Sequence, residues 1–186
     1  PMKSFFCFIV FLMSFNLTSG QSIFNHFENT PDVTYASISP KMFQLLGQMS
    51  FLGKDDPESA EILEIINNIK SFKVLITVEG GIQNQFTEWV DKEAENNDLE
   101  TLMTMSESDT ELFFYAKQGK SENKIEKLLM YSKGISKSVQ EAKIKGQAIE
   151  SVVLMIEGDL DLYQIAKLAT KMDLPGGDQL KKAGVK

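Results

Sequence analysis

The chain has 186 residues, of which 26 are acidic and 19 basic, giving a formal net charge of −7 at pH 7. Every basic residue is a lysine, and an acidic chain without arginine argues against nucleic acid, anionic membrane surfaces and bidentate phosphate recognition. Cys7 is the only cysteine and His26 the only histidine, so no disulfide can form within the chain.

The chain opens with a segment typical of a cleavable signal peptide. Lys3 supplies a positive charge, and residues 5–15 form an apolar run that is shorter than the roughly 20 residues a membrane span needs. Thr18 and Gly20 suit the small-residue subsites of signal peptidase, so we expect cleavage after Gly20. A retained N-terminal anchor is the alternative. A lipoprotein would need a cysteine at the cleavage point, whereas Cys7 lies inside the apolar run.

Removal of residues 1–20 as a signal peptide would leave a cysteine-free domain with 18 lysines, 26 acidic residues and a net charge of −8. We expect residues 21–173 to fold as a single α+β domain and residues 174–186 to form a flexible tail. Such a domain has no thiol nucleophile and no cysteine ligand for zinc. The predicted location is periplasmic or extracellular, with no stable membrane span after cleavage.

The first predicted elements are a short strand and two helices. Residues 33–39 favour a strand, and Ser39-Pro40 then forms a suitable N-cap and first-turn pair for a helix. A loop over residues 53–57 precedes a second helix over residues 60–70, whose isoleucines we expect to pack on the sheet. The apolar stripes are Met42, Leu45, Leu46 and Met49 in the first helix, and Ile62, Ile65, Ile66 and Ile69 in the second.

A second strand and a longer helix follow. Residues 72–78 are rich in β-branched side chains and predict the strand. Gly80-Gly81 then turns the chain into a helix that fades across residues 93–98. One face of this helix is apolar, which indicates a core contact more than a ligand pocket, and it consists of Ile82, Phe86, Trp89 and Val90.

Alternation with period two then replaces the helical spacing. Residues 99–105, 111–116 and 125–131 predict three strands of an antiparallel meander. Their turns fall at residues 106–109 and 118–122.

The last part of the chain is less uniform. Residues 134–148 are polar and lysine-rich, and favour no single structure, whereas residues 151–156 predict a final strand. Asp159 or Asp161 should cap a last helix with apolar positions Leu162, Ile165, Ala166, Ala169 and Met172, ended by Pro175-Gly-Gly. Together these elements predict an α+β fold: an antiparallel or mixed sheet of about five to six strands with about four helices packed on it.

Three segments carry a resemblance to a known family: VTYASISPKMF at residues 33–43, KSFKVLITVE at residues 70–79 and IEGDLDLYQIAKL at residues 156–168. The chain resembles the exported Gram-negative family catalogued as domain of unknown function 4252, over nearly all of the expected mature chain. The closing segment is its most specific part. The resemblance implies an envelope location and an α+β fold, and it carries no catalytic residues across. Residues 134–148 are longer than the family's usual last hairpin, which leaves the topology there open.

Few residues offer catalytic chemistry. His26 lies near the expected mature N-terminus, where a surface or helix role is favoured over that of a base. Gly119-Lys120-Ser121 matches the end of a phosphate-binding loop, but Phe114 stands where the first glycine of that motif belongs, so a hairpin turn is favoured. Gly80-Gly81 follows a strand and opens a helix, yet without GxGxxG a tight turn is favoured there over an anion site.

Two acidic groups fall short of a complete metal site: Asp55, Asp56 and Glu58 in one, and Asp159 and Asp161 in the other. Neither has the six or more oxygens of a calcium loop, and helix capping accounts for both. We therefore predict no catalytic, cofactor or metal residues.

The leading hypothesis is a non-catalytic envelope or extracellular protein that binds another envelope protein or a small apolar ligand. The alternatives are a carboxylate-dependent hydrolase, whose acid pair only the fold would assemble, and a periplasmic lipid or peptide carrier with a pocket between sheet and helices.

Overall fold

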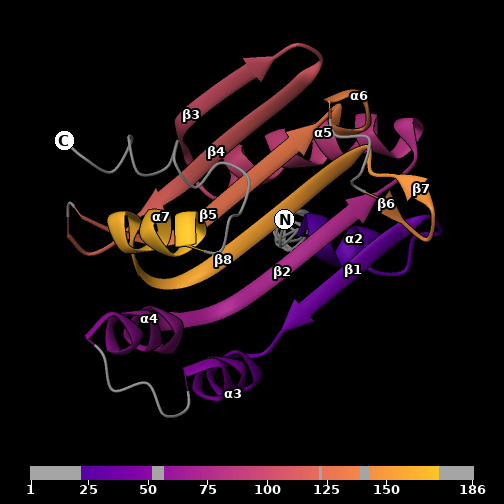
Figure 1. The fold of residues 1–186 in the computed structure, drawn as a ribbon. Helices are drawn as coiled ribbons and strands as arrows, with labels where there is room; N and C mark the ends of the chain where they lie inside the picture. The colour runs from indigo at the N-terminus through magenta and orange to yellow at the C-terminus, as the bar shows by residue number, and fades with distance from the viewer. Residues whose placement is uncertain (1–21, 52–56, 122, 139–142, 172–186) are drawn as a thin grey trace, which may run out of the picture.

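A computed structural model describes residues 22–51, 57–121, 123–138 and 143–171. It shows one six-stranded antiparallel sheet in the order β1-β2-β8-β5-β4-β3, with helices on both faces (Figure 1). A small separate hairpin pairs β6 with β7. The strands are β1 (Val33–Ile38), β2 (Ile69–Thr77), β3 (Glu100–Glu107), β4 (Thr110–Gln118), β5 (Lys124–Lys133), β6 (Lys143–Ile144), β7 (Gln147–Ala148) and β8 (Ser151–Asp161). The predicted α+β class is thus confirmed.

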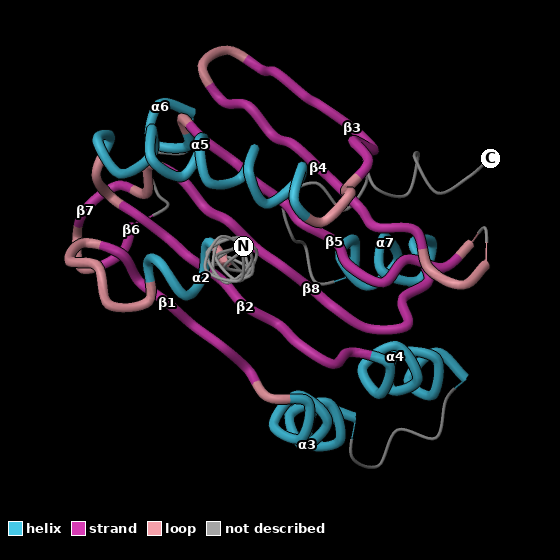
Figure 2. The backbone as a smooth tube through the Cα atoms, turned by 180° about the vertical axis from the view of Figure 1, so that it is seen from behind, coloured by secondary structure: helices cyan, strands magenta, loops and turns pink. Residues whose placement is uncertain are grey.

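The helices lie on opposite sides of the sheet. They are α2 (Ile23–Phe27), α3 (Pro40–Phe51), α4 (Pro57–Asn68), α5 (Gly80–Asn96), α6 (Ile135–Ser138) and α7 (Leu162–Lys171). The face toward the viewer in Figure 1, called the front face here, bears α3, α4 and α7. The back face bears α2 and α5, as Figure 2 shows from behind. Within the described ranges, no helix is both long enough and apolar enough to cross a membrane.

Side chains of the central strands alternate between two cores, because successive residues of a strand point to opposite faces. In β5, Leu128 joins the front core and Leu129 the back core, and both are at most 2% exposed. The front core also holds Ile65 of α4 and Ile165 of α7. On the back face Phe86 of α5 is fully buried. The predicted contact of the isoleucine helix with the sheet is confirmed.

The boundary between α4 and β2 differs from the prediction of a helix over residues 60–70. The helix ends at Asn68, and Ile69 already pairs with Gly158 of β8. A Cβ at Gly158 would lie 2.1 Å from the Asn68 carbonyl oxygen, so the helix end passes this strand in close contact. Pairing with a distant strand therefore overrides the helical spacing of the isoleucines.

The final strand is also longer than residues 151–156, because its far end finds a partner. Leu160 and Asp161 pair with the beginning of β5, so β8 continues to Asp161. Residues 134–148, which favoured no single structure, contain α6 and the β6–β7 hairpin. The predicted signal peptide, residues 53–56 of the predicted loop and the Pro175-Gly-Gly helix end lie outside the described residues.

Candidate functional site

A small polar hollow of about 190 Å³ lies on the back face, between α2, α5 and the central strands. Its position follows from local sequence. Glu93 comes three residues after the buried Val90, on the face of α5 that meets the sheet, and Lys127 and Glu157 are direct cross-strand partners. The lining residues are Ser22, Lys73, Glu93, Asn96, Asn97, Lys127, Met155 and Glu157.

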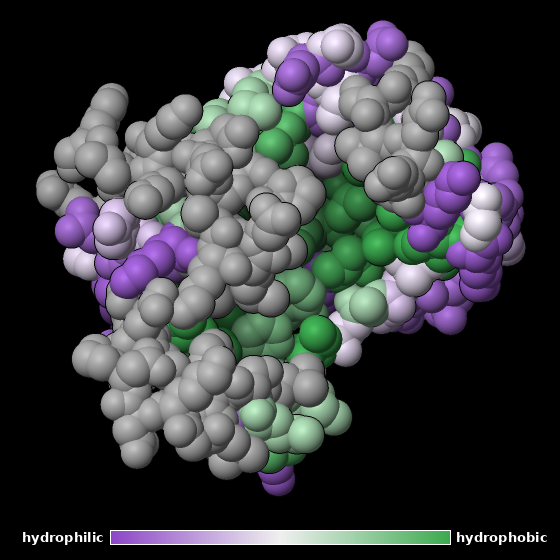
Figure 3. Space-filling view, in the orientation of Figure 1, coloured by the Kyte–Doolittle hydropathy of each residue, from purple (hydrophilic) through white to green (hydrophobic). Residues whose placement is uncertain are grey.

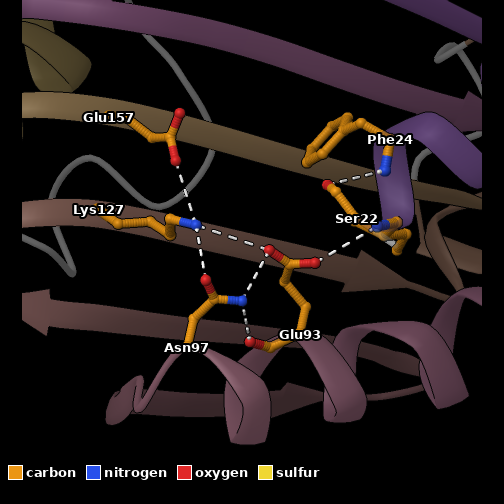
Figure 4. A network of polar contacts seen from close by, with 7 residues as sticks. Ser22, Phe24, Glu93, Asn97, Lys127 and Glu157 are labelled. Carbon is orange, nitrogen blue, oxygen red and sulfur yellow. Dashed lines mark hydrogen bonds and ion pairs between the residues drawn. The ribbon is translucent and has the colours of Figure 1, made fainter. Parts of the chain in front are cut away.

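Lys127 is at the centre of a network of charges in this hollow (Figure 4). Its Nζ lies 3.1 Å from Glu157 Oε1 and 3.6 Å from Glu93 Oε1. It also donates a hydrogen bond to Asn97 Oδ1 at 3.2 Å. The side chains of Glu93 and Lys127 are only 6% and 14% exposed, whereas that of Glu157 is 35% exposed. The pair of Glu93 and Lys127 is therefore the shielded part of the network.

Both carboxylate oxygens of Glu93 are also held by hydrogen bonds. Oε1 accepts from Asn97 Nδ2 at 3.0 Å, and Oε2 accepts from the backbone N–H of Ile23 at 3.3 Å (Figure 4). The network thus joins α2, α5, β5 and β8. Each Glu93 oxygen thus has a partner within the protein, and Oε1 has two, the Asn97 amide and the Lys127 ammonium. The arrangement suits anchoring of the N-terminal helix.

A buried tyrosine lies further along the same face. Tyr131 is 1% exposed, and its hydroxyl lies 2.8 Å from Thr87 Oγ1 and donates to the Gln83 carbonyl oxygen at 3.2 Å. Burial raises the pKa of Tyr131 to about 12, and the nearby charges of Asp91 and Glu111 add to the rise, while the Thr87 contact opposes it. The hydroxyl therefore stays protonated at neutral pH and is unsuited to act as a base.

The front face has an apolar surface that the described helices leave partly open. We call it the front-face patch, and its side chains are neighbours in register: Val74 is opposite Leu154, Ile76 is opposite Val152, and Leu154 is also opposite Met130. All five side chains are partly exposed. Figure 3 shows hydrophobic side chains gathered over these strands. Further along β8 the cover improves, since Ile156 is only 9% exposed.

A second apolar surface lies on α3. Three residues of the predicted apolar stripe are exposed: Met42 at 51%, Leu45 at 45% and Met49 at 70%. Phe43 packs inward instead, with its ring centroid 5.5 Å from that of Phe72. The helix starts as predicted, because Ser39 Oγ accepts from the Met42 N–H at 3.3 Å. It lies beside α4 and β2 and so buries only one side (Figure 1).

Comparison with known proteins gives a family and no activity. Residues 27–168 match the family described as Domain of unknown function (DUF4252). The chain belongs to the DUF4252 family. No curated protein and no solved structure is detectably similar to it. The matched DUF4252 range contains the front-face patch and the Glu93–Lys127 pair, but not Ile23, whose N–H binds Glu93.

In this DUF4252 domain His26 has the predicted helix role. It lies on α2, exposed, and stacks on Trp89 with ring centroids 4.3 Å apart. The helix that carries His26 is anchored in the back core, because Ile23 and Phe24 are fully buried and Phe27 is 1% exposed. Periodicity did not reveal this, since five helical residues are too short for a pattern.

The two glycine motifs differ in outcome. Gly119 donates to the Lys124 carbonyl oxygen at 2.7 Å and closes the β4–β5 hairpin, as predicted. Gly80 and Gly81 open α5, but neither has a left-handed φ and a Cβ at either would meet no atom within 4 Å. The tight turn expected there does not require glycine. The N-cap Glu79 places a carboxylate at this helix start, which disfavours an anion.

Only some residues of the two acidic groups lie in the described part of the chain. Asp161 Oδ1 accepts from the N–H groups of Tyr163 and Gln164 at 3.0 and 3.1 Å, so its capping role is confirmed. Asp159 is exposed on β8, and Asp55 and Asp56 lie outside the described residues. Among the residues described, no three His, Cys, Asp or Glu side chains are grouped as metal ligands would be. Sequence analysis missed Glu93 and Lys127, because contacts between distant elements leave no local pattern.

Proposed function

We propose that this protein is a non-catalytic binding domain of the cell envelope or extracellular space, and that its front-face patch binds an apolar surface of another envelope protein. The observation that carries the proposal is that parts of β2 and β8, at the centre of the sheet, are apolar on both faces. Residues 152–156 of β8 are five consecutive apolar residues, and Val74 to Ile76 of β2 form a run of three. An antiparallel sheet with one face in water instead alternates apolar and polar residues. These strands therefore suit cover on both faces.

Within the described residues, the back face of these strands is covered more completely than the front face. The back-facing Val153 and Leu75 are fully buried under α2 and α5, and the front-facing Ile156 is buried near α4 and α7. Val152 and Ile76 on the front face are left partly exposed and belong to neither core. Contiguous apolar side chains that stay partly exposed to solvent suit a site of interaction with another protein.

The two alternative functions have less support from the geometry. A lipid or peptide carrier needs an enclosed apolar cavity, whereas the hollow on the back face is small and lined mainly by charged and amide side chains. A carboxylate-dependent hydrolase needs a pair of acids facing a substrate. The acids that the fold brings together, Glu93 and Glu157, are both turned toward Lys127.

The envelope or extracellular location is supported by the signal-peptide pattern of residues 1–20. A partner should therefore be sought among exported proteins of the same cell.

Site-specific photo-crosslinking tests the proposal in living cells without removing any core side chain. A photoreactive amino acid replaces Val152 in the patch, and in a matched variant it replaces Thr104, which is exposed on β3. We expect a discrete crosslinked species from position 152 and none from position 104. Absence of a crosslink at position 152, or the same pattern at both positions, would contradict the proposal.

A further inference from the structure

We infer that two copies of this chain associate through the edge formed by β1 and α3. The inference does not rest on the proposed function, although this edge adjoins the front-face patch: Thr34 and Ala36 of β1 are opposite Ile76 and Val74 of the patch. It starts from the end of the sheet: β1 is the outermost strand and pairs only with β2 in the described chain. Its outer backbone groups thus have no strand partner there. Such an edge is a template for another strand.

The two edges of the sheet differ in how they are protected. Proteins guard edge strands with charged residues and with bulges. β3, the opposite edge, has Glu100 and Glu107 at its ends and a register irregularity between Thr101 and Met103. β1 has neither device: its six residues are uncharged, and it pairs with β2 in unbroken register from Val33 to Ile38. Among the described strands, β1 is therefore the edge that lacks both protective features.

The exposed face of α3 adds apolar area beside this strand. α3 follows β1 after Ser39 and lies at the same edge of the sheet (Figure 1). Met42, Leu45 and Met49 recur at spacings of three and four, so they share one face of the helix, and each is at least 45% exposed. Strand pairing would supply hydrogen bonds and these side chains would supply buried apolar surface.

Charge indicates that the occupant is a second copy. Residues 33–51 contain one charged residue, Lys41, although charged residues make up 24% of the chain. An uncharged surface offers no complementarity to a strongly charged partner, and a single lysine gives little attraction to anionic lipid. Two copies of net charge −7 repel each other least where both surfaces lack acids. An uncharged strand is self-complementary about a two-fold axis, as an isologous dimer requires.

The first test measures oligomeric state by sedimentation equilibrium over a range of protein concentrations. We expect a monomer–dimer equilibrium for the wild type. Thr34→Lys with Ala36→Lys places charges on the exposed side chains of β1, and Thr101→Lys with Thr104→Lys is the matched control on β3, where both side chains are also exposed. The dimer dissociation constant should rise at least tenfold in the β1 variant and stay within about twofold in the control, with thermal melts checking that both fold.

A cysteine crosslink tests the contact itself and does not depend on a destabilising charge. In the chain carrying Cys7→Ser no cysteine remains, so Ala36→Cys introduces one thiol on β1 and Thr104→Cys one on β3. A bifunctional thiol-reactive crosslinker, which does not need the two cysteines to be directly opposite, should give a linked dimer for position 36 and not for position 104. A monomeric wild type at every concentration would overturn the inference. So would equal effects of the β1 and β3 variants, or a dimer lost on Val152→Lys but kept in the β1 variant.

Discussion

Replacing Lys127 by methionine removes the cation of the back-face network and keeps the length of the side chain. Glu93, which is 6% exposed, would then be an acid without its counter-ion. Loss of one partner of a buried pair costs about 3–5 kcal/mol, and an exposed pair is worth about 0–1 kcal/mol. Since Lys127 itself is 14% exposed and Asn97 and Ile23 still donate to Glu93, we expect a loss of about 2–3 kcal/mol in unfolding free energy at pH 7.

The matched control lies on the same strand. Lys133 also lies 3.1 Å from a carboxylate, that of Glu111, but these side chains are 25% and 41% exposed. Lys133→Met should therefore cost less than about 1 kcal/mol. Urea unfolding gives both values. In the double variant Lys127→Met, Glu93→Gln, the loss should be smaller than the sum of the single losses, because the unpaired charge is gone. Equal small losses for both lysine variants would refute the view that the hollow shields its charges.

Three further predictions follow from burial and from the N-terminal pattern. The pKa of Tyr131 is higher in the folded than in the unfolded protein. The part of the unfolding free energy that is linked to this proton is therefore complete below pH about 10 and is lost as the pH rises toward 12. Between pH 10 and 12, the unfolding free energy of the wild type, measured with urea, should therefore fall by about 2–3 kcal/mol more than that of Tyr131→Phe. Parallel curves of unfolding free energy against pH for the two proteins would contradict this. Ile66 is 7% exposed on α4, so Ile66→Ala should cost about 2–5 kcal/mol in the same assay and Ile66→Asp should prevent folding; near-neutral behaviour would mean that α4 is not packed. Intact-mass analysis of the exported chain should place its first residue at or near Gln21, whereas a full-length chain in the inner membrane would exclude cleavage.

Local pattern in the sequence was sufficient to predict most elements of the fold. The alternation in residues 111–116 and 125–131 placed β4 and β5, because a strand with one face toward each core repeats every second residue. Ser39 and Asp161 indicated helix starts, because a cap acts on N–H groups two or three residues ahead. The family resemblance could also be recognised from the sequence, and the match of residues 27–168 to the DUF4252 family confirms it.

Which apolar stripe is buried was decided only by the tertiary structure. The isoleucines of α4 and the methionines of α3 have the same helical spacing, yet Ile65 is 3% exposed and Met49 is 70% exposed. Ile69 follows the helical pattern but joins a strand, because β8 is beside it. Glu93 and Lys127 form an ion pair although they are 34 residues apart in the sequence. Periodicity reports the direction of a side chain from its own backbone, whereas burial and pairing depend on which distant element lies there, and that is settled only when the strands take their order in the sheet.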